Sequence, residues 1–188
     1  MPILWDSKKQ TIVNNESSEI VKILNSAFDD LLDEQSVNLY PQHLQEEIDI
    51  FTADIFPTVN NGAYRVGFAG TQEAYEEAFD LLFAKLDELE ARFSDGRKFA
   101  HGDVLTLSDI HLFMTLIRFD VAYYGLFKAN LRRISDYPSL NAYTRRVYNI
   151  PEIKEVVNFD HIKTGYYSIK ALNPSRIVPK GPALMMSQ

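Results

Sequence analysis

The stretch that decides the fold reads Pro2-Ile3-Leu4-Trp5-Asp6 and then, after a short polar gap, Thr11-Ile12-Val13-Asn14-Asn15-Glu16-Ser17-Ser18-Glu19-Ile20. Its two apolar runs predict short strands joined by a tight turn, because polar residues bound them on both sides. A helix is expected over 17–33, where apolar side chains recur at helical spacing: Ile20, Ile23, Leu24, Ala27, Phe28 and Leu31. The order strand, turn, strand, helix predicts a small ββα unit.

The start of this helix is the first candidate binding site. Glu16 and Ser17 fall at the N-cap and first turn, where unpaired backbone N–H groups and the helix dipole favour a bound carboxylate. Ser17 suits an α-carboxylate and Glu16 suits an α-ammonium group, so the pair matches both ends of a zwitterion. The alternative is that these residues only cap the helix, as serine followed by acids often does. The spacing leaves both interpretations open.

Composition indicates one compact protein with a charged, well-solvated surface. Of its 188 residues 46% are hydrophobic and 24% are charged, so the chain can bury a sizeable core. The net charge of -7 argues against nucleic acid and anionic membranes as partners. We find neither a signal peptide nor an apolar run of membrane-spanning length, and we expect the cytoplasm. The 188 residues include no cysteine, so they can form no disulfide, no thiolate zinc site and no cysteine nucleophile.

Beyond the ββα unit the pattern is helical. We expect the first domain over 1–34, an all-helical domain over 39–170, and an extended tail over 171–188 with three prolines. The polar connector 33–38 is the expected boundary.

Local signals place several helices in the second domain. Pro41 suits the first turn of one helix, and a bend is expected at Asn60-Asn61-Gly62. Thr71 begins another helix, which should end at Ser94-Asp95-Gly96 and bury the following side chains: Ala74, Ala78, Leu81, Leu82, Leu86 and Leu89.

The clearest helix start lies at Leu105-Thr106-Leu107-Ser108-Asp109-Ile110. Thr106 can cap this helix while Asp109 reaches back to the cap's own N–H, and Leu105 and Ile110 stand at the staple positions. The helix is expected to be central and buried, and to run through Phe127. Further helices are expected from Asp136-Tyr137-Pro138 to about Asn149, over 152–157 and over 160–170.

Other chemistries find little support in the residue pattern. His43, His101, His111 and His161 lack a metal-ligand spacing, so we expect no metal. His111 is expected to be a hydrogen-bonded core residue. No serine-histidine-acid order and no glycine-rich phosphate loop occurs. Arg132 and Arg133 are interpreted as a solvated helix end or a salt bridge.

A series of short motifs gives the chain a family resemblance. Beside the opening stretch stand these segments: Asn60-Asn61-Gly62-Ala63-Tyr64, Phe127-Lys128-Ala129-Asn130-Leu131-Arg132-Arg133, His161-Ile162-Lys163 with Tyr166-Tyr167, and Asn173-Pro174 with Ile177-Val178-Pro179. In this order they resemble the Xi-class glutathione transferases, also called glutathionyl-hydroquinone reductases. The resemblance covers almost the whole chain.

The resemblance implies a fold and a chemistry. Family members join a thioredoxin-like domain to a glutathione-transferase C-terminal helical bundle and pair as homodimers through the helical domain. Residues 1–34 would then be the C-terminal half of the thioredoxin-like, glutathione-binding domain. A cysteine thiolate in the family removes glutathione from a glutathionyl-hydroquinone, and a second glutathione resolves the mixed disulfide. That cysteine precedes the Pro2–Asp6 strand in the family, so we expect no catalytic nucleophile in this chain and no activity from it alone.

The resemblance also assigns site residues. Pro2 matches the cis-proline of the thioredoxin fold, and the backbone of Met1 would pair with the cysteinyl part of glutathione. Glu16 and Ser17 match the γ-glutamyl contacts. Tyr64 and one of Tyr166 or Tyr167 match tyrosines that line the hydroquinone pocket, and the sequence does not choose between the last two. The alternative for each is an ordinary core or surface tyrosine, since the chain has 10 of them.

Two positions depart from the family pattern. Ala129 stands where many relatives have cysteine, which we interpret as a packing change, and Gly165 stands where we expect histidine, at the pocket rim. Three explanations stay open for the expected absence of an upstream half: a fragment of a longer enzyme, a split enzyme with a separate thioredoxin-like half, and a noncatalytic scaffold or interaction protein. The partners implied are glutathione and a quinone-derived small molecule.

Overall fold

The computed structural model describes residues 2–31 and 37–183. Within these ranges the chain is mainly helical, with one two-stranded sheet near the N-terminus, so the predicted fold class is confirmed. The chain divides into two compact units, Met1–Glu46 and Glu47–Gln188. Most of the predicted connector 33–38 lies outside the described residues.

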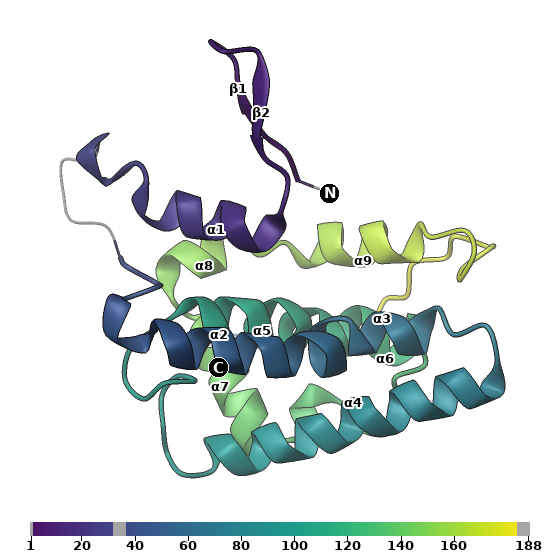
Figure 1. Ribbon diagram of the computed structural model, residues 1–188. Helices are drawn as coiled ribbons and strands as arrows, with labels where there is room; N and C mark the ends of the chain where they lie inside the picture. The colour runs from purple at the N-terminus through teal and green to yellow at the C-terminus, as the bar shows by residue number, and fades with distance from the viewer. Residues whose placement is uncertain (1, 32–36, 184–188) are drawn as a thin grey trace. The chain divides into compact units, whose positions relative to one another are not determined.

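The first unit holds the predicted ββα arrangement. Strand β1 (Leu4–Asp6) pairs antiparallel with β2 (Thr11–Asn14), with Trp5 opposite Ile12 (Figure 1). The turn is closed by the Asp6 carboxylate, which accepts hydrogen bonds from the backbone N–H groups of Lys8 and Lys9 at 2.8 and 2.9 Å. Such a carboxylate-to-backbone bond is the local interaction that makes aspartate a turn residue.

Helix α1 (Ser17–Ser26) is shorter than the sequence predicts. A short 3₁₀ turn follows at Asp29–Leu31, and the rest of the predicted helix, 32–33, lies outside the described residues. Near the end of the helix, the Asn25 amide donates to Asn38 Oδ1 at 2.9 Å and accepts from the Leu39 N–H at 2.7 Å. Two acids at 29 and 30 also oppose the negative end of the helix dipole, so the helical conformation is least favourable there.

The next elements along the chain form a helical hairpin, most of which belongs to the second unit. Pro41 precedes a 3₁₀ turn (Gln42–Leu44) that leads into α2 (Gln45–Ile55). At the predicted bend the backbone forms a π-helical turn over Phe56–Asn60 before α3 (Gly62–Gly67). The long helix α4 (Gln72–Phe93) then returns along α3 and the π turn, as Figure 1 shows.

Helix α4 begins as predicted, because the Thr71 hydroxyl accepts the Ala74 N–H at 3.2 Å. Two of its predicted core positions are wrong: Ala74 is exposed and Leu81 keeps 44% of its surface. Phe83 is buried instead. The face of α4 that packs against the core therefore includes Leu82 and Phe83.

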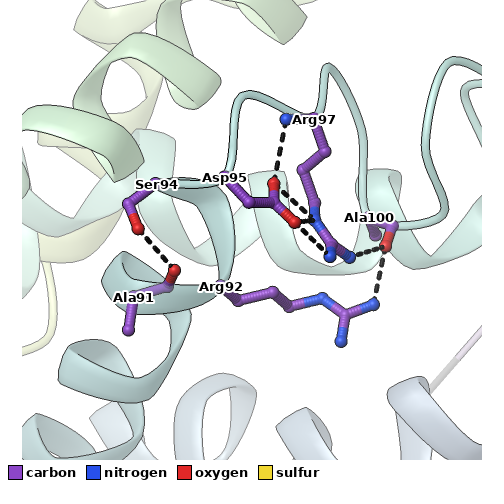
Figure 2. A network of polar contacts seen from close by, with 6 residues as sticks. All are labelled: Ala91, Arg92, Ser94, Asp95, Arg97 and Ala100. Carbon is purple, nitrogen blue, oxygen red and sulfur yellow. Dashed lines mark hydrogen bonds and ion pairs between the residues drawn. The ribbon is translucent and has the colours of Figure 1, made fainter.

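A polar network holds the loop after α4 (Figure 2). Arg97 forms a fork with the Asp95 carboxylate, at 3.0 Å from Nε to Oδ1 and 2.5 Å from Nη2 to Oδ2, and this lowers the pKa of Asp95 to about 2. The Ala100 carbonyl accepts from both Arg92 (2.7 Å) and Arg97 (3.2 Å). Two cationic side chains from the helix end and the loop thus meet on one backbone acceptor.

The predicted capping box of the central helix is confirmed. Helix α5 (Leu107–Arg118) starts with the Asp109 carboxylate accepting the Thr106 N–H at 2.9 Å and the Thr106 hydroxyl at 3.0 Å. The same carboxylate accepts the Ala100 N–H at 2.7 Å and the Tyr143 hydroxyl at 3.0 Å. Asp109 is therefore a buried junction between the loop, α5 and the later helix α7.

The central helix does not run uninterrupted to Phe127. After α5 the backbone widens into a second π-helical turn, Phe119–Tyr123, and ends in the short α6 (Tyr124–Leu126). Both faces of this segment are largely buried, although Met114 is 44% exposed. Ala129, one of the departures from the family pattern, is fully buried beyond it.

Three more helices complete the unit: α7 (Pro138–Tyr148), α8 (Pro151–Val156) and α9 (Phe159–Tyr167). Helix α7 packs on α4 and α5, and α9 packs on the second π turn. Helix α9 ends three residues before the predicted end at 170, and residues 168–183 contain no helix or strand. The core is continuous, and its largest fully buried side chains include Phe119, Phe127, Tyr137, Tyr143, Leu82, Leu86, Leu112 and Leu116.

Candidate functional site

Three tyrosine hydroxyls from distant parts of the sequence meet in the second unit. Tyr64 lies on α3, Tyr123 ends the second π turn, and Tyr166 lies near the end of α9. The Tyr166 hydroxyl is 2.5 Å from that of Tyr64 and 2.9 Å from that of Tyr123. Tyr166 is thus the central member of a chain of phenols, which we call the tyrosine triad.

Ring packing fixes the triad. The Phe127 ring stacks on Tyr123 with centroids 5.0 Å apart and meets Tyr64 edge-on at 5.3 Å. The Tyr166 ring meets Tyr123 edge-on at 5.3 Å. Gly67 makes this packing possible, because a Cβ there would overlap the Phe127 ring. Edge-on and offset contacts of this kind are favourable for aromatic rings.

The two π turns set the register of the triad. A π turn adds one residue to a helix and so rotates everything that follows about its axis. The first π turn precedes Tyr64 by a few residues, and the second contains Tyr123. Asn60 joins the two segments, because its amide donates to the His111 carbonyl at 2.7 Å and to the Thr115 hydroxyl at 2.9 Å. The helices that carry Tyr64 and Tyr123 are therefore tied together.

The surroundings keep the deeper hydroxyls protonated. Burial raises the pKa of Tyr166 to about 12, with hydrogen bonding to Tyr64 adding to the effect. Burial also raises the pKa of Tyr123 far above its ordinary value, and its contact with Tyr166 acts in the same direction. Both groups are consequently neutral phenols at neutral pH, able to donate as well as accept a hydrogen bond.

A cavity of about 470 Å³ opens beside the triad. We call it the tyrosine cavity; its lining consists of Tyr64, Arg118, His161, Ile162, Gly165, Tyr166 and Ile169. Tyr64 is 40% exposed, so its hydroxyl is within reach of a ligand. The combination of apolar walls, a few polar groups and a volume of several hundred Å³ is typical of a site for a small aromatic molecule.

The structure separates Tyr166 from Tyr167. Tyr167 does not line the tyrosine cavity; its hydroxyl points at Gly125, where a Cβ would lie only 2.8 Å away. Gly165, the second departure from the family pattern, does line the cavity, and a Cβ there would meet nothing within 4 Å. The two neighbouring tyrosines of the motif therefore have different surroundings.

The residues predicted to hold glutathione belong to the first unit. Glu16 is the N-cap of α1, but its side chain makes no cap hydrogen bond. Its backbone N–H donates to Asn14 Oδ1 at 2.7 Å, and its carboxylate accepts a long bond of 3.4 Å from the Ser18 hydroxyl. Ser17 begins the helix and is exposed, as is Pro2, while Met1 lies outside the described residues. The Glu16 carboxylate is not engaged in capping its own helix.

The other polar residues singled out from the sequence make contacts within the fold. Within 2–31 and 37–183 no group of three or more acidic or histidine side chains is placed to hold a metal. No helix of the described residues is both long and apolar enough to cross a membrane. Arg132 makes a salt bridge with Asp87 at 2.5 Å, and Arg133 lies over the Tyr124 ring at 4.7 Å.

Sequence reasoning missed Tyr123 as a member of the site. It lies in the predicted central helix, where an aromatic side chain reads as core, and it is indeed almost completely buried. Its hydroxyl nevertheless lies 2.9 Å from that of Tyr166, and its ring contacts the rings of Tyr64 and Tyr166. The signal that could have found it is the presence of a phenol, rather than phenylalanine, on an otherwise apolar helix, because a buried hydroxyl needs a partner.

Comparison with known proteins shows which family of proteins this chain is similar to. Residues 72–146 match the family model for the glutathione S-transferase C-terminal domain. The chain is 50% identical over 184 residues to the glutathionyl-hydroquinone reductase PcpF of Sphingobium chlorophenolicum, covering 97% of this chain and 58% of that protein. It is 46% identical over 183 residues to the reductase YqjG of Escherichia coli, covering 97% and 55%.

Solved structures agree. The glutathione-bound structure of YqjG superposes with a TM-score of 0.92 at 44% identity, covering 100% of this chain and 61% of that one. The Xi glutathione S-transferase of Phanerochaete chrysosporium superposes with a TM-score of 0.90 at 48% identity, covering 97% and 59%. The chain thus spans less than two thirds of the length of these relatives. Over almost its whole length, its strong homologues are Xi-class glutathione transferases and glutathionyl-hydroquinone reductases.

Proposed function

We propose that the protein to which this chain belongs reduces glutathionyl-hydroquinones, and that the tyrosine cavity receives the hydroquinone ring. The observation that carries the proposal is the convergence of three phenol hydroxyls beside a cavity that two of the tyrosines, Tyr64 and Tyr166, line. The relatives named above as glutathionyl-hydroquinone reductases support it. A hydroquinone is flat and apolar on its faces and carries two hydroxyls on its edge, which is the complement of such a cavity.

The triad would act by hydrogen bonding. Tyr166 has both its neighbours within hydrogen-bond distance, so one of its bonds is already shared with Tyr123. The more exposed Tyr64 can exchange its bond to Tyr166 for a bond to a ring oxygen. Because burial keeps Tyr123 and Tyr166 protonated, the chain of phenols can supply a donor to that oxygen.

The proposed reaction is the reductive cleavage of an aryl thioether by a thiolate, followed by thiol-disulfide exchange. A thiolate attacks the glutathione sulfur, the bond from sulfur to ring breaks, and the ring takes up a proton to give the free hydroquinone. The resulting mixed disulfide is resolved by a second glutathione, giving glutathione disulfide. The 188 residues hold no cysteine, so the thiolate must come from outside them. The role proposed for this chain is binding and orientation, and we expect it to be inactive by itself.

Glutathione itself is the proposed ligand of the first unit. The γ-glutamyl group carries an α-carboxylate for Ser17 and an α-ammonium group for Glu16, while Met1 and Pro2 would receive the cysteinyl part. That the Glu16 carboxylate is not used to cap α1 supports this assignment. The bound glutathione in the YqjG structure supports glutathione as the co-substrate. A homodimer formed through the helical unit, in the cytoplasm, completes the proposal.

Paired tyrosine variants test the ring site. Calorimetry would compare the affinity of the chain for a hydroquinone in the wild type, Tyr166→Phe and Tyr167→Phe. We expect Tyr166→Phe to weaken binding by about tenfold, the loss typical of one or two hydrogen bonds, and Tyr167→Phe to leave it unchanged. Equal affinities in all three proteins would contradict the assignment of the tyrosine cavity.

A further inference from the structure

Arg118 brings a positive charge to the tyrosine cavity. It is the last residue of α5 and lines the cavity together with Tyr64 and Tyr166. It also lines the neighbouring apolar groove of about 370 Å³ between α5, α8 and α9. Arg118 is half-buried, and among the described residues it is the one arginine or lysine in the lining of the tyrosine cavity.

No carboxylate neutralises this charge inside the cavity. The seven lining residues include no aspartate or glutamate, and His161 is the other titratable group besides the tyrosines. Within the described part of the chain Arg118 makes no salt bridge. Its Nη1 donates to the Met114 carbonyl of its own helix and lies 3.5 Å from the Met114 sulfur. Arg65, one residue after Tyr64, is by contrast paired with Glu77 at 3.4 Å.

The surroundings strengthen the interaction that Arg118 offers. Ile162 and Ile169 supply apolar walls, and the triad supplies rings. Beside apolar walls a charge acts on its neighbours with less screening than in bulk water. Although burial keeps Tyr166 neutral, the charge of Arg118 by itself acts to lower the pKa of this phenol, as it would that of a bound phenol. The arginine fork retains N–H groups beyond the one given to Met114.

We propose that Arg118 recognises a negatively charged oxygen on the bound ring, so that the tyrosine cavity prefers the monoanion of a hydroquinone over its neutral form. This inference rests on the proposed function and names the substrate class more closely. Hydroquinones whose hydroxyls are acidified by electron-withdrawing substituents would bind best. One ring oxygen would meet the phenols of the triad and the ionised one the guanidinium.

A nitrophenol is a suitable probe, because its colour reports its ionisation. Titrating the nitrophenol bound to the chain against pH gives its pKa in the cavity, and the same titration without protein gives the reference. We expect the wild type to lower the pKa of the bound probe. Arg118→Met should weaken phenolate binding by about tenfold or more, as expected for the loss of a charge-assisted hydrogen bond, while Arg118→Lys keeps part of the effect.

Two controls separate the charge at this position from general effects. Arg146→Met removes one positive charge from an exposed site on α7, where the side chain bonds only the Lys98 carbonyl at 2.9 Å, and should leave the probe unaffected. A neutral ring compound, hydroquinone dimethyl ether, should bind the wild type and Arg118→Met equally. Thermal unfolding of each variant shows whether the fold is kept.

The outcomes distinguish the inference from the function on which it rests. Wild-type protein that binds neither the nitrophenol nor hydroquinone contradicts the proposed ring site itself. Probe binding that is the same in wild type and Arg118→Met overturns the role of Arg118 and leaves the ring site standing. S-methylglutathione provides the remaining arm: if Arg118→Met weakens its binding and not that of the nitrophenol, the anionic partner is a glutathione carboxylate, and the inference is wrong.

Discussion

The Tyr166 hydroxyl lies 2.9 Å from the Tyr123 hydroxyl, although 43 residues separate them in the sequence. The first comes from a short helix near the end of the chain and the second from a π turn in the central helix. Each phenol is a partner for the other in a place where an isolated hydroxyl would be costly. Their contact is therefore both a structural bond and a prepared hydrogen-bonding group for a ligand.

Alkaline pH should weaken the fold through these phenols. Because burial raises the pKa of Tyr166 to about 12, from an ordinary value near 10, the folded state holds its proton longer than the unfolded state. The stabilisation is complete below about pH 10 and is lost as pH rises toward 12. Urea unfolding between pH 9 and 12 should show this loss, and Tyr166→Phe should reduce its slope. A slope unchanged in the variant would contradict the assignment.

The glycine under Phe127 offers a test of how the triad is positioned. Gly67→Ala should cost about 1–3 kcal/mol, because its Cβ would overlap the Phe127 ring on which Tyr123 stacks. It should also weaken ring binding without touching a hydroxyl. The matched control for stability is Gly165→Ala, where the space is open and the helix should gain up to about 1 kcal/mol. Unfolding curves of both variants check this contrast, and a hydroquinone titration of Gly67→Ala checks the effect on ring binding.

The two threonine-capped helices should respond very differently to loss of their caps. Asp109→Ala removes a buried acceptor shared by Thr106, Ala100 and Tyr143, and leaves several donors unsatisfied at about 1–3 kcal/mol each. We expect a loss of at least about 3 kcal/mol. Thr71→Ala removes one exposed cap bond and should cost about 1 kcal/mol. Equal losses measured in urea would show that the Asp109 junction is not special.

Mild acid should reveal the buried His101. Its side chain is 2% exposed, and burial lowers its pKa, against the opposing influence of Asp109 and of Glu47, whose carboxylate lies 3.5 Å away. A histidine that the fold holds neutral stabilises the folded state at pH values above its unfolded pKa, near 6.5. This stabilisation is lost as the pH falls below that value. The free energy of unfolding should fall between about pH 6.5 and 5 in the wild type and less in His101→Gln. Parallel curves would count against this explanation.

Local signals in the sequence predicted the parts of the fold that local bonds determine. The caps at Thr71 and Thr106 lie where their hydroxyls and the Asp109 carboxylate suggested, because a cap is made by neighbours in sequence. The exposure of Leu81 was not predictable in this way, since the buried face of α4 depends on how that helix rotates against the others.

The site likewise combines residues that the sequence indicated with residues that depend on how the helices pack. Tyr64 and Tyr166 were candidates by family resemblance, but the choice between Tyr166 and Tyr167 depends on which face of α9 meets the core, and successive residues of a helix point about 100° apart. Tyr123 depends on a π turn, which inserts a residue without any clear sequence signal. Arg118 was not a candidate in the sequence, because nothing local shows that the cavity lining places it beside the phenols.

The most direct test of the central claim is a crystal structure of the chain with a hydroquinone conjugate of glutathione, which the cysteine-free chain is not expected to cleave. The account predicts density for the ring in the tyrosine cavity, with one ring oxygen within hydrogen-bond distance of Tyr64 or Tyr166. A ring found in the apolar groove between α5, α8 and α9, or a conjugate that leaves the tyrosine cavity empty while bound elsewhere, would contradict it.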